Sequence, residues 1–206
     1  IEHGEQGGAI SPGAVGFDIN CGVRAVALNI EANDIPNLEK LARRLNGRIP
    51  AGGSGKGGID ITESKLNTIL QGGLNELESI DVEQHHVAGS IESDGCFEID
   101  ELSISHRAKQ RGMKALGTLG SGNHFLELQR VSEIVEDETA KKWNLSQNQV
   151  VAMIHSGSRG LGHQVCSDHI HQLELRLKQR GNDWVDEEWG YVLPDRQLAS
   201  APIHSK

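Results

Sequence analysis

Three short stretches of the sequence place side chains that can bind a metal ion next to glycines. Asp18 and Cys21 lie in GFDINCGVR, His124 lies in GSGNHFLEL, and His155 lies in MIHSGSRGLG. Each stretch adjoins an apolar run that predicts a strand. A carboxylate, a thiolate and two imidazoles suffice to hold a divalent cation, and burying them without partners would be costly. The sequence therefore predicts a metal site where three strands end.

The residue types alone leave the metal and the role of each stretch open. Cysteine and histidine favour zinc, whereas the carboxylate leaves room for manganese. Taken alone, His124 would more simply be a core histidine whose ring bonds to the backbone. Asp18 and Cys21 would point to opposite faces of a strand unless a bulge or sharp turn intervenes, and the adjoining Gly22 makes a bulge reasonable.

Arg24 and Arg159 lie close to these ligands in the sequence. Arg159 follows a Gly/Ser turn that leads into a predicted helix. The free backbone amides of such a turn and the planar fork of a guanidinium suit a phosphate group. The simpler alternative is a serine N-cap at Ser158 with a solvated arginine.

The spacing of apolar residues predicts elements that would position these side chains. We expect an α+β fold of mixed sheets and flanking helices, in a single domain with the site at strand ends. The helix after Asn33 or Asp34 should be capped by one of them and end at Gly47. The expected strands are 14–30, which should be mostly buried, 123–131 and 148–155, and the other helices are near 62–78, 99–111, 137–145 and 160–179.

Alternation along the middle strand assigns its side chains to two faces. One face should carry His124, Leu126 and Leu128, and the other Asn123, Phe125 and Glu127.

The composition restricts the class of protein. The 206 residues carry a formal net charge of −9, which argues against loose coating of nucleic acid but leaves room for a local basic pocket. Cys21, Cys96 and Cys166 are an odd number without framework spacing, which favours reduced thiols in the cytoplasm. We find no membrane-spanning run and no signal peptide. Because both ends read as cut, we expect residues 1–206 to be the central part of a larger domain.

The glycine-rich segment 48–58 invites comparison with a phosphate-binding loop. Its PAGGSGKGG places Pro50 and Gly57 where the P-loop pattern requires glycine and serine or threonine. We therefore interpret the segment as a surface loop.

Taken together, GFDINCGVR, AKQRG with LGTLGSGNHFLE, and HSGSRGLGHQ resemble the RtcB-type RNA-splicing ligase family in this order. The resemblance implies an enzyme that uses GTP and two manganese ions. It would join an RNA 3′-phosphate or 2′,3′-cyclic phosphate end to a 5′-hydroxyl end, in tRNA splicing or RNA repair, with an activating protein as a further partner.

The resemblance also implies a role for each matching residue. The metal ligands would be Asp18, Cys21, His124 and His155, with Cys21 bridging the two ions. Asn123, Phe125 and Glu127 would surround the guanine nucleotide, and Arg24 and Arg159 would hold phosphates.

One departure from the family pattern leaves an alternative. The histidine that receives the guanylate lies in a C-terminal region of the family that these residues do not match, and nucleotidyl transfer needs that nucleophile. We therefore expect this chain to carry only part of an active site. The alternative is a stand-alone metal- or phosphate-binding module without ligase activity.

Overall fold

The computed structural model describes residues 9–10, 13, 16–51, 58–80, 82, 91–97, 99, 103–179 and 201–202. The chain divides into two compact units. One contains 1–19, 61–113 and 158–206, and the other contains 20–60 and 114–157. Residues 52–57 of the glycine-rich loop lie outside the described residues.

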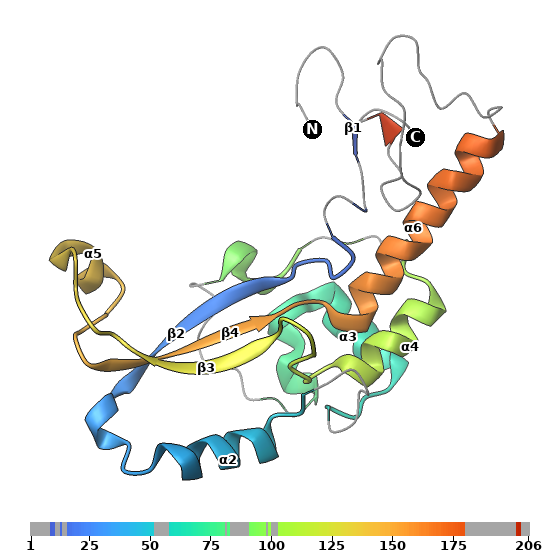
Figure 1. Ribbon diagram of the computed structural model, residues 1–206. Helices are drawn as coiled ribbons and strands as arrows, with labels where there is room; N and C mark the ends of the chain where they lie inside the picture. The colour runs from blue at the N-terminus through green and yellow to red at the C-terminus, as the bar shows by residue number, and fades with distance from the viewer. Residues whose placement is uncertain are drawn as a thin grey trace. The chain divides into compact units, whose positions relative to one another are not determined.

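The second unit is built on a three-stranded antiparallel sheet (Figure 1). Its strands are β2 (Gly22–Glu31), β3 (Phe125–Arg130) and β4 (Gln149–Ser156), in the order β2-β4-β3. The fold is α+β as the sequence predicts, but the described strand pairs are all antiparallel, whereas we expected mixed sheets. The register aligns His155 of β4 with Val23 on one side and Phe125 on the other.

Helix α2 (Leu38–Arg48) begins later than the sequence suggested. Its cap is Asn37, whose side-chain oxygen accepts the Lys40 N–H at 2.8 Å. The two residues that we expected as caps lie instead in a 3₁₀ turn, η1 (Ala32–Asp34). Gly47 does not end the helix, because the helix continues through Arg48.

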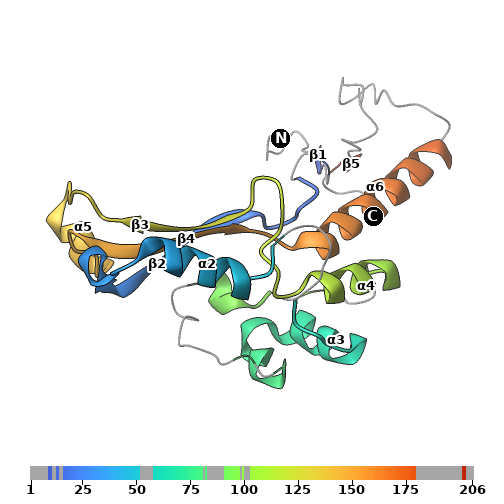
Figure 2. The same cartoon turned by 60° about the horizontal axis from the view of Figure 1, so that its bottom comes forward.

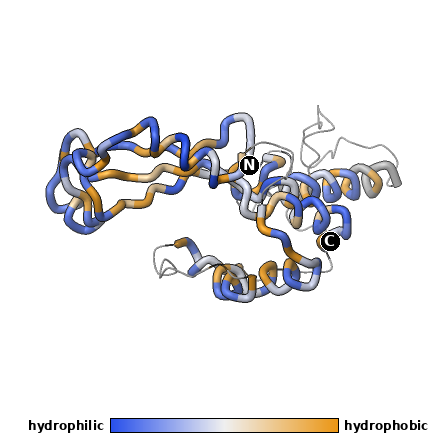
Figure 3. The backbone as a smooth tube through the Cα atoms, turned by 90° about the horizontal axis from the view of Figure 1, so that it is seen from below, coloured by the Kyte–Doolittle hydropathy of each residue, from blue (hydrophilic) through white to orange (hydrophobic). Residues whose placement is uncertain are grey.

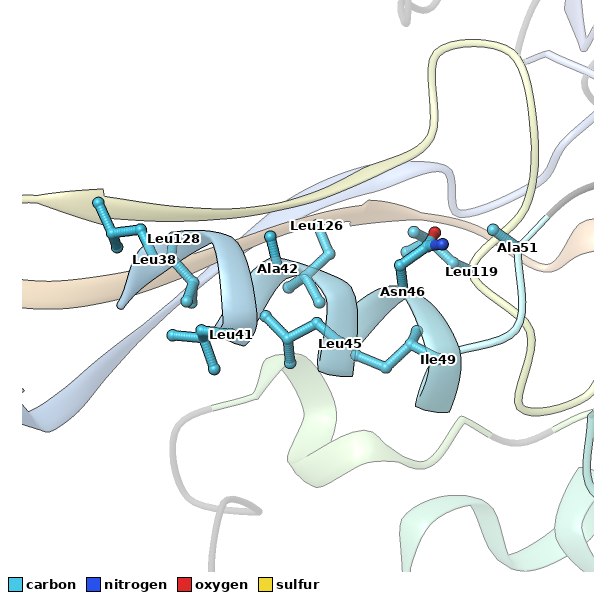
Figure 4. A pocket seen from close by; sticks show the side chains of 10 residues that line it. All are labelled: Leu38, Leu41, Ala42, Leu45, Asn46, Ile49, Ala51, Leu119, Leu126 and Leu128. Carbon is cyan, nitrogen blue, oxygen red and sulfur yellow. The ribbon is translucent and has the colours of Figure 1, made fainter. Parts of the chain in front are cut away.

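One face of the sheet packs against α2 (Figure 2). The leucines of α2 share a helix face at spacings of three and four residues, and on β3 the alternate residues Leu126 and Leu128 face them. Figure 4 shows the cavity between the two elements. It is lined by Leu38, Leu41, Ala42, Leu45, Asn46, Ile49, Ala51, Leu119, Leu126 and Leu128. The opposite face therefore carries the side chains aligned with His155.

Strand β2 differs from the long buried strand that we expected over 14–30. It begins at Gly22, residues 17–20 form bends and turns, and most of its side chains are exposed. Val23 keeps 53% of its surface and Val26 keeps 43%. Figure 3 shows hydrophobic residues along the strands of the sheet. Strand β2, however, is an edge strand with only one neighbour in the described sheet. Hydrophobicity predicts burial only where another layer packs against the strand.

The first unit is mainly helical. Its elements are β1 (Ala9–Ile10), α3 (Glu63–Gly72), the 3₁₀ segments η2 (Gly73–Ile80) and η4 (Glu92–Gly95), most of α4 (His106–Ala115), α6 (Arg159–Gln179) and β5 (Ala201–Pro202). The helix that we expected near 62–78 is divided, because α3 ends at Gly72 and the 3₁₀ segment η2 follows it. Cys166 and Ile170 of α6 form a core with Phe17, Ile19 and Leu173.

Helix α5 (Asp137–Lys142) follows α4 in the chain. Helix α4 starts at His106 rather than near 99, because the Ser105 hydroxyl accepts the Ala108 N–H at 3.1 Å and caps the helix. Among the residues that the structure describes, no helix is both long and apolar enough to cross a membrane.

Candidate metal site

Cys21, His124 and His155 bring their ligand atoms together in the sheet unit. Cys21 Sγ lies 3.1 Å from His155 Nε2 and 3.3 Å from His124 Nε2. One ligand atom from each residue lies within 4.8 Å of the others. Cys21 is exposed and the two histidines are half-buried, so solvent reaches the group. The sequence prediction that these three residues meet is confirmed.

The ring of His155 is oriented by the backbone. Its Nδ1 lies 2.8 Å from the carbonyl oxygen of Asn123. A carbonyl can only accept, so Nδ1 must carry the proton and donate it. In the neutral ring, Nε2 therefore presents its lone pair to Cys21. Metal-binding histidines commonly have their other ring nitrogen held in this way.

His124 is brought to the group by the glycine-rich turn before β3. Gly120 has φ +121° and Gly122 has φ +74°, in the left-handed region that favours glycine. The strand starts only at Phe125, so alternation does not extend to His124. His124 therefore meets His155, with ring centroids 5.2 Å apart, and does not share the face of Leu126 and Leu128 as we expected.

Asp18 belongs to the helical unit. Its Oδ1 accepts the backbone N–H of Arg159 at 2.7 Å and the hydroxyl of Ser158 at 3.2 Å, at the start of α6. Asp18 and Cys21 are separated by a turn in which Asn20 has φ +61°. Of the two features that we considered between them, a bulge or a sharp turn, the structure has the turn. That Asp18 is a metal ligand stays a prediction.

The two arginines occupy different positions. Arg24 aligns with Ile154 in the β2–β4 register, one residue from the pair of Val23 and His155, so it is on the other face of the sheet from His155. Arg159 opens α6 with φ +58° in the helical unit. The Ser158 hydroxyl, which we considered as a helix cap, donates to Asp18 Oδ1 at 3.2 Å. Phosphate binding by either arginine stays a prediction.

The expected nucleotide residues lie on or beside β3. Phe125 packs edge-on against His155, with ring centroids 5.5 Å apart. Glu127 is exposed and accepts the side-chain amide of Gln129 at 2.8 Å. Phe125 and Glu127 share the sheet face of His155, as alternation predicts. Asn123 lies in the preceding turn and contributes its carbonyl to His155.

Sequence reasoning missed the hydroxyl of Ser156. It donates to the Leu119 carbonyl at 2.8 Å and ties the glycine-rich turn to β4. Its only sequence signal is its place directly after His155. His163 is exposed, and its ring contacts the ring of Phe17 in the helical unit, with centroids 5.2 Å apart and planes tilted by 38°.

The donor set of the cluster suits a transition metal. One thiol and two imidazole nitrogens, open to solvent, leave coordination positions for water or a substrate oxygen. Cys21, Cys96 and Cys166 are thiols rather than members of disulfides, so the Cys21 sulfur can serve as a ligand. The close approach of Sγ to both Nε2 atoms fits residues that would share one ion.

Comparison with known proteins gives the same family across the chain. The family model described as tRNA-splicing ligase RtcB matches residues 3–206. The chain is 44% identical to the tRNA-splicing ligase RtcB of Methanococcus maripaludis, covering 98% of this chain and 41% of the relative. It is 39% identical to that of Aeropyrum pernix, covering 98% and 40%. It is also 40% identical to the RNA-splicing ligase RtcB of Mycobacterium tuberculosis, covering 98% and 45%.

These matches run through both compact units and include all three stretches that carry the candidate ligands. The chain spans between 40% and 45% of the length of these curated relatives. A family-model match over nearly the whole chain, together with identities near 40%, establishes descent. The chain therefore belongs to the tRNA-splicing ligase RtcB family.

Proposed function

We propose that the chain is part of an RNA ligase that uses GTP and manganese. The ligase would join an RNA 3′-phosphate or 2′,3′-cyclic phosphate end to a 5′-hydroxyl end, in tRNA splicing or RNA repair. The observation that carries the proposal is the convergence of Cys21, His124 and His155 in a chain whose relatives are named RNA-splicing ligases.

Cys21 Sγ and the Nε2 atoms of His124 and His155 would hold the metal, with the Asp18 carboxylate as a further ligand. Two manganese ions, when bound, would supply positive charge that neutralises phosphate oxygens and lowers the pKa of an attacking hydroxyl. The protein's own contribution is orientation. The Asn123 carbonyl keeps the His155 proton on Nδ1, so that Nε2 can coordinate.

Asn123, Phe125 and Glu127 would bind the guanine nucleotide. Phe125 and Glu127 lie on the sheet face of His155, so a base stacked on the Phe125 ring would lie next to the metal ligands. The Glu127 carboxylate already accepts an amide N–H from Gln129. The same oxygens could accept the two N–H groups on the edge of guanine.

Arg24 and Arg159 would contact phosphates of the RNA or the nucleotide. A guanidinium binds phosphate with two parallel hydrogen bonds and stays charged at every physiological pH. The net charge of −9 supports capture of RNA ends in a local pocket, because a protein that coats RNA requires a broad basic surface. The partners would be cleaved RNA ends and an activating protein. The protein would act in the cytoplasm.

The test is a ligation assay with the complete reading frame that contains this chain. Two RNA oligonucleotides, one with a 3′-phosphate and one with a 5′-hydroxyl, should be joined only when GTP and manganese are both present. Cys21→Ala and His155→Ala should abolish joining. Arg44→Ala, which removes an exposed charge from α2, should not change the rate.

Two results would contradict the proposal. Joining without GTP would exclude the nucleotide-dependent route. Binding of manganese without any joined product would favour the second candidate, a metal- or phosphate-binding module. That candidate rests on the same three ligands.

A further inference from the structure

The glycine-rich turn that carries His124 is attached to β4 at two neighbouring residues. On one side of the sheet, His155 Nδ1 donates to the Asn123 carbonyl at 2.8 Å. On the other side, the Ser156 hydroxyl donates to the Leu119 carbonyl at 2.8 Å. Adjacent residues of a strand point to opposite faces, so the two bonds hold the turn from both sides.

The two anchors enclose the flexible part of the turn. Between Leu119 and Asn123 the chain contains Gly120 and Gly122, both in the left-handed region. Two glycines in so short a segment give it many accessible conformations. Without an anchor at each end, the turn would not hold His124 Nε2 at one distance from Cys21 Sγ.

The Leu119 end has a fixed base. Its backbone N–H donates to the Pro50 carbonyl at 2.8 Å, and its side chain lines the cavity beneath α2. Leu119 is therefore set by the core of the sheet unit, and Ser156 transmits that position to the end of β4 next to His155. None of the sequence motifs assigns this task to Ser156.

From these contacts we infer that Ser156 is a positioning residue for the metal ligands. Its hydroxyl fixes the turn so that His124 and His155 present both Nε2 atoms to Cys21. The inference rests on the proposed metal site, and it adds a residue that touches neither the metal nor the nucleotide. Removing the hydrogen-bond partner of a metal-binding histidine typically changes metal affinity by about 10–100-fold. Ser156 acts one step further away, because it holds the turn that supplies the Asn123 carbonyl to His155.

The test is cobalt binding by the 206-residue chain, followed through the thiolate-to-cobalt charge-transfer band of Cys21. The two variants are Ser156→Val and Ser156→Thr. Valine and threonine side chains have nearly the same shape, but only threonine keeps a hydroxyl. We expect the dissociation constant for cobalt to rise at least about tenfold in the valine variant and to stay within about threefold of the original in the threonine variant.

The matched control is Thr118→Val. Thr118 is 8% exposed, and its hydroxyl donates to the Ala115 carbonyl at 2.6 Å, a bond that does not reach the turn of His124. Both valine variants should lower the melting temperature, but only Ser156→Val should weaken cobalt binding and shift the ligand-field spectrum. A merely structural role for Ser156 would lower the melting temperature without separating the two variants in cobalt affinity.

Each outcome decides a different claim. Equal cobalt affinity in Ser156→Val and the original chain, or an equal loss in Thr118→Val, would overturn the role of Ser156 and leave the metal site standing. An original chain that folds but binds no cobalt would overturn the metal site itself. Melting temperatures and circular dichroism of each variant establish that only folded chains are compared.

Discussion

His155 Nδ1 donates a hydrogen bond to the carbonyl of Asn123, 32 positions earlier in the chain, at 2.8 Å. This bond determines which nitrogen of His155 can act as a ligand. It leaves Nε2 directed at Cys21 Sγ, 3.1 Å away. The end of β4 and the turn before β3 therefore build the candidate metal site together.

Asp18 has two separable tasks, one structural and one proposed. Its Oδ1 accepts the Arg159 N–H and the Ser158 hydroxyl. Asp18→Ala should lower the free energy of unfolding by about 1–2 kcal/mol, because these donors lose their acceptor. Asp18→Asn keeps a side-chain oxygen and should be nearly as stable as the original, as chemical denaturation would establish.

The asparagine variant also tests the proposed ligand role of Asp18. A neutral amide is a poorer ligand for manganese than a carboxylate. Asp18→Asn should therefore weaken manganese binding in a calorimetric titration while the fold is retained. Unchanged affinity in this variant would remove the Asp18 carboxylate from the ligand set.

Asn20 tests the turn before β2. Its φ of +61° lies in a region that β-branched residues enter only at considerable cost. Asn20→Val should lower the free energy of unfolding by about 1–3 kcal/mol, and Asn20→Gly should be close to neutral. The control is Asn29→Val in β2, since valine suits an extended strand. Equal effects of the two valine substitutions in thermal unfolding would contradict the turn.

Asp168 joins two segments of the helical unit. It accepts the Ser105 hydroxyl at 2.5 Å and the side-chain amide of the buried Gln164 at 2.7 Å. Asp168→Ala should lower the free energy of unfolding by about 1–3 kcal/mol in chemical denaturation, because two donors lose their acceptor in a partly buried place.

The exposed pair of Glu138 and Lys141 provides the comparison for Asp168. Lys141 Nζ lies 3.1 Å from Glu138 Oε1, and both side chains are more than 70% exposed. Glu138→Ala should cost less than about 0.5 kcal/mol, because solvent screens the pair. A loss in this variant as large as in Asp168→Ala would contradict the difference between the two environments.

Cys166 makes the free energy of unfolding depend on pH in the alkaline range. Burial raises the pKa of its thiol above the ordinary value of 9.0. Well below pH 9 the thiol is protonated in both the folded and the unfolded chain, so its contribution to stability is constant. As the pH rises through this value, the unfolded chain releases the proton while the folded chain retains it, and unfolding becomes more favourable.

The measurement for Cys166 compares the original chain with Cys166→Ala between about pH 7 and pH 10. The difference in their free energies of unfolding should be flat up to about pH 8 and should then decrease. A difference that stays constant across this range would show that the buried thiol does not have a raised pKa.

The meeting of Cys21, His124 and His155 could be predicted from sequence, because each chemical group lies beside glycine at the end of an apolar run. That pattern placed His155 at the end of a strand, and the spacing of leucines gave the helix face that α2 packs against β3. The prediction that His124 shares a sheet face with Leu126 and Leu128 was wrong. Alternation applies only within a strand, and His124 lies in the turn before β3.

Other features depend on contacts between segments far apart in the sequence. The exposure of β2 depends on its position at the edge of the sheet, which its own composition does not encode. The Ser156 hydroxyl donates to the Leu119 carbonyl, 37 positions away. No local sequence pattern distinguishes a serine that makes such a contact from one that does not. The start of α2 depended on which of several adjacent asparagine and aspartate residues formed the cap.

The most direct test of the central claim is the location of manganese in crystals of the chain grown with that ion. Diffraction data collected on both sides of the manganese absorption edge give an anomalous difference map. We predict a peak within bonding distance of Cys21 Sγ and of the Nε2 atoms of His124 and His155. A folded chain whose map has no peak at these three atoms, or whose manganese lies elsewhere, would contradict the proposed metal site.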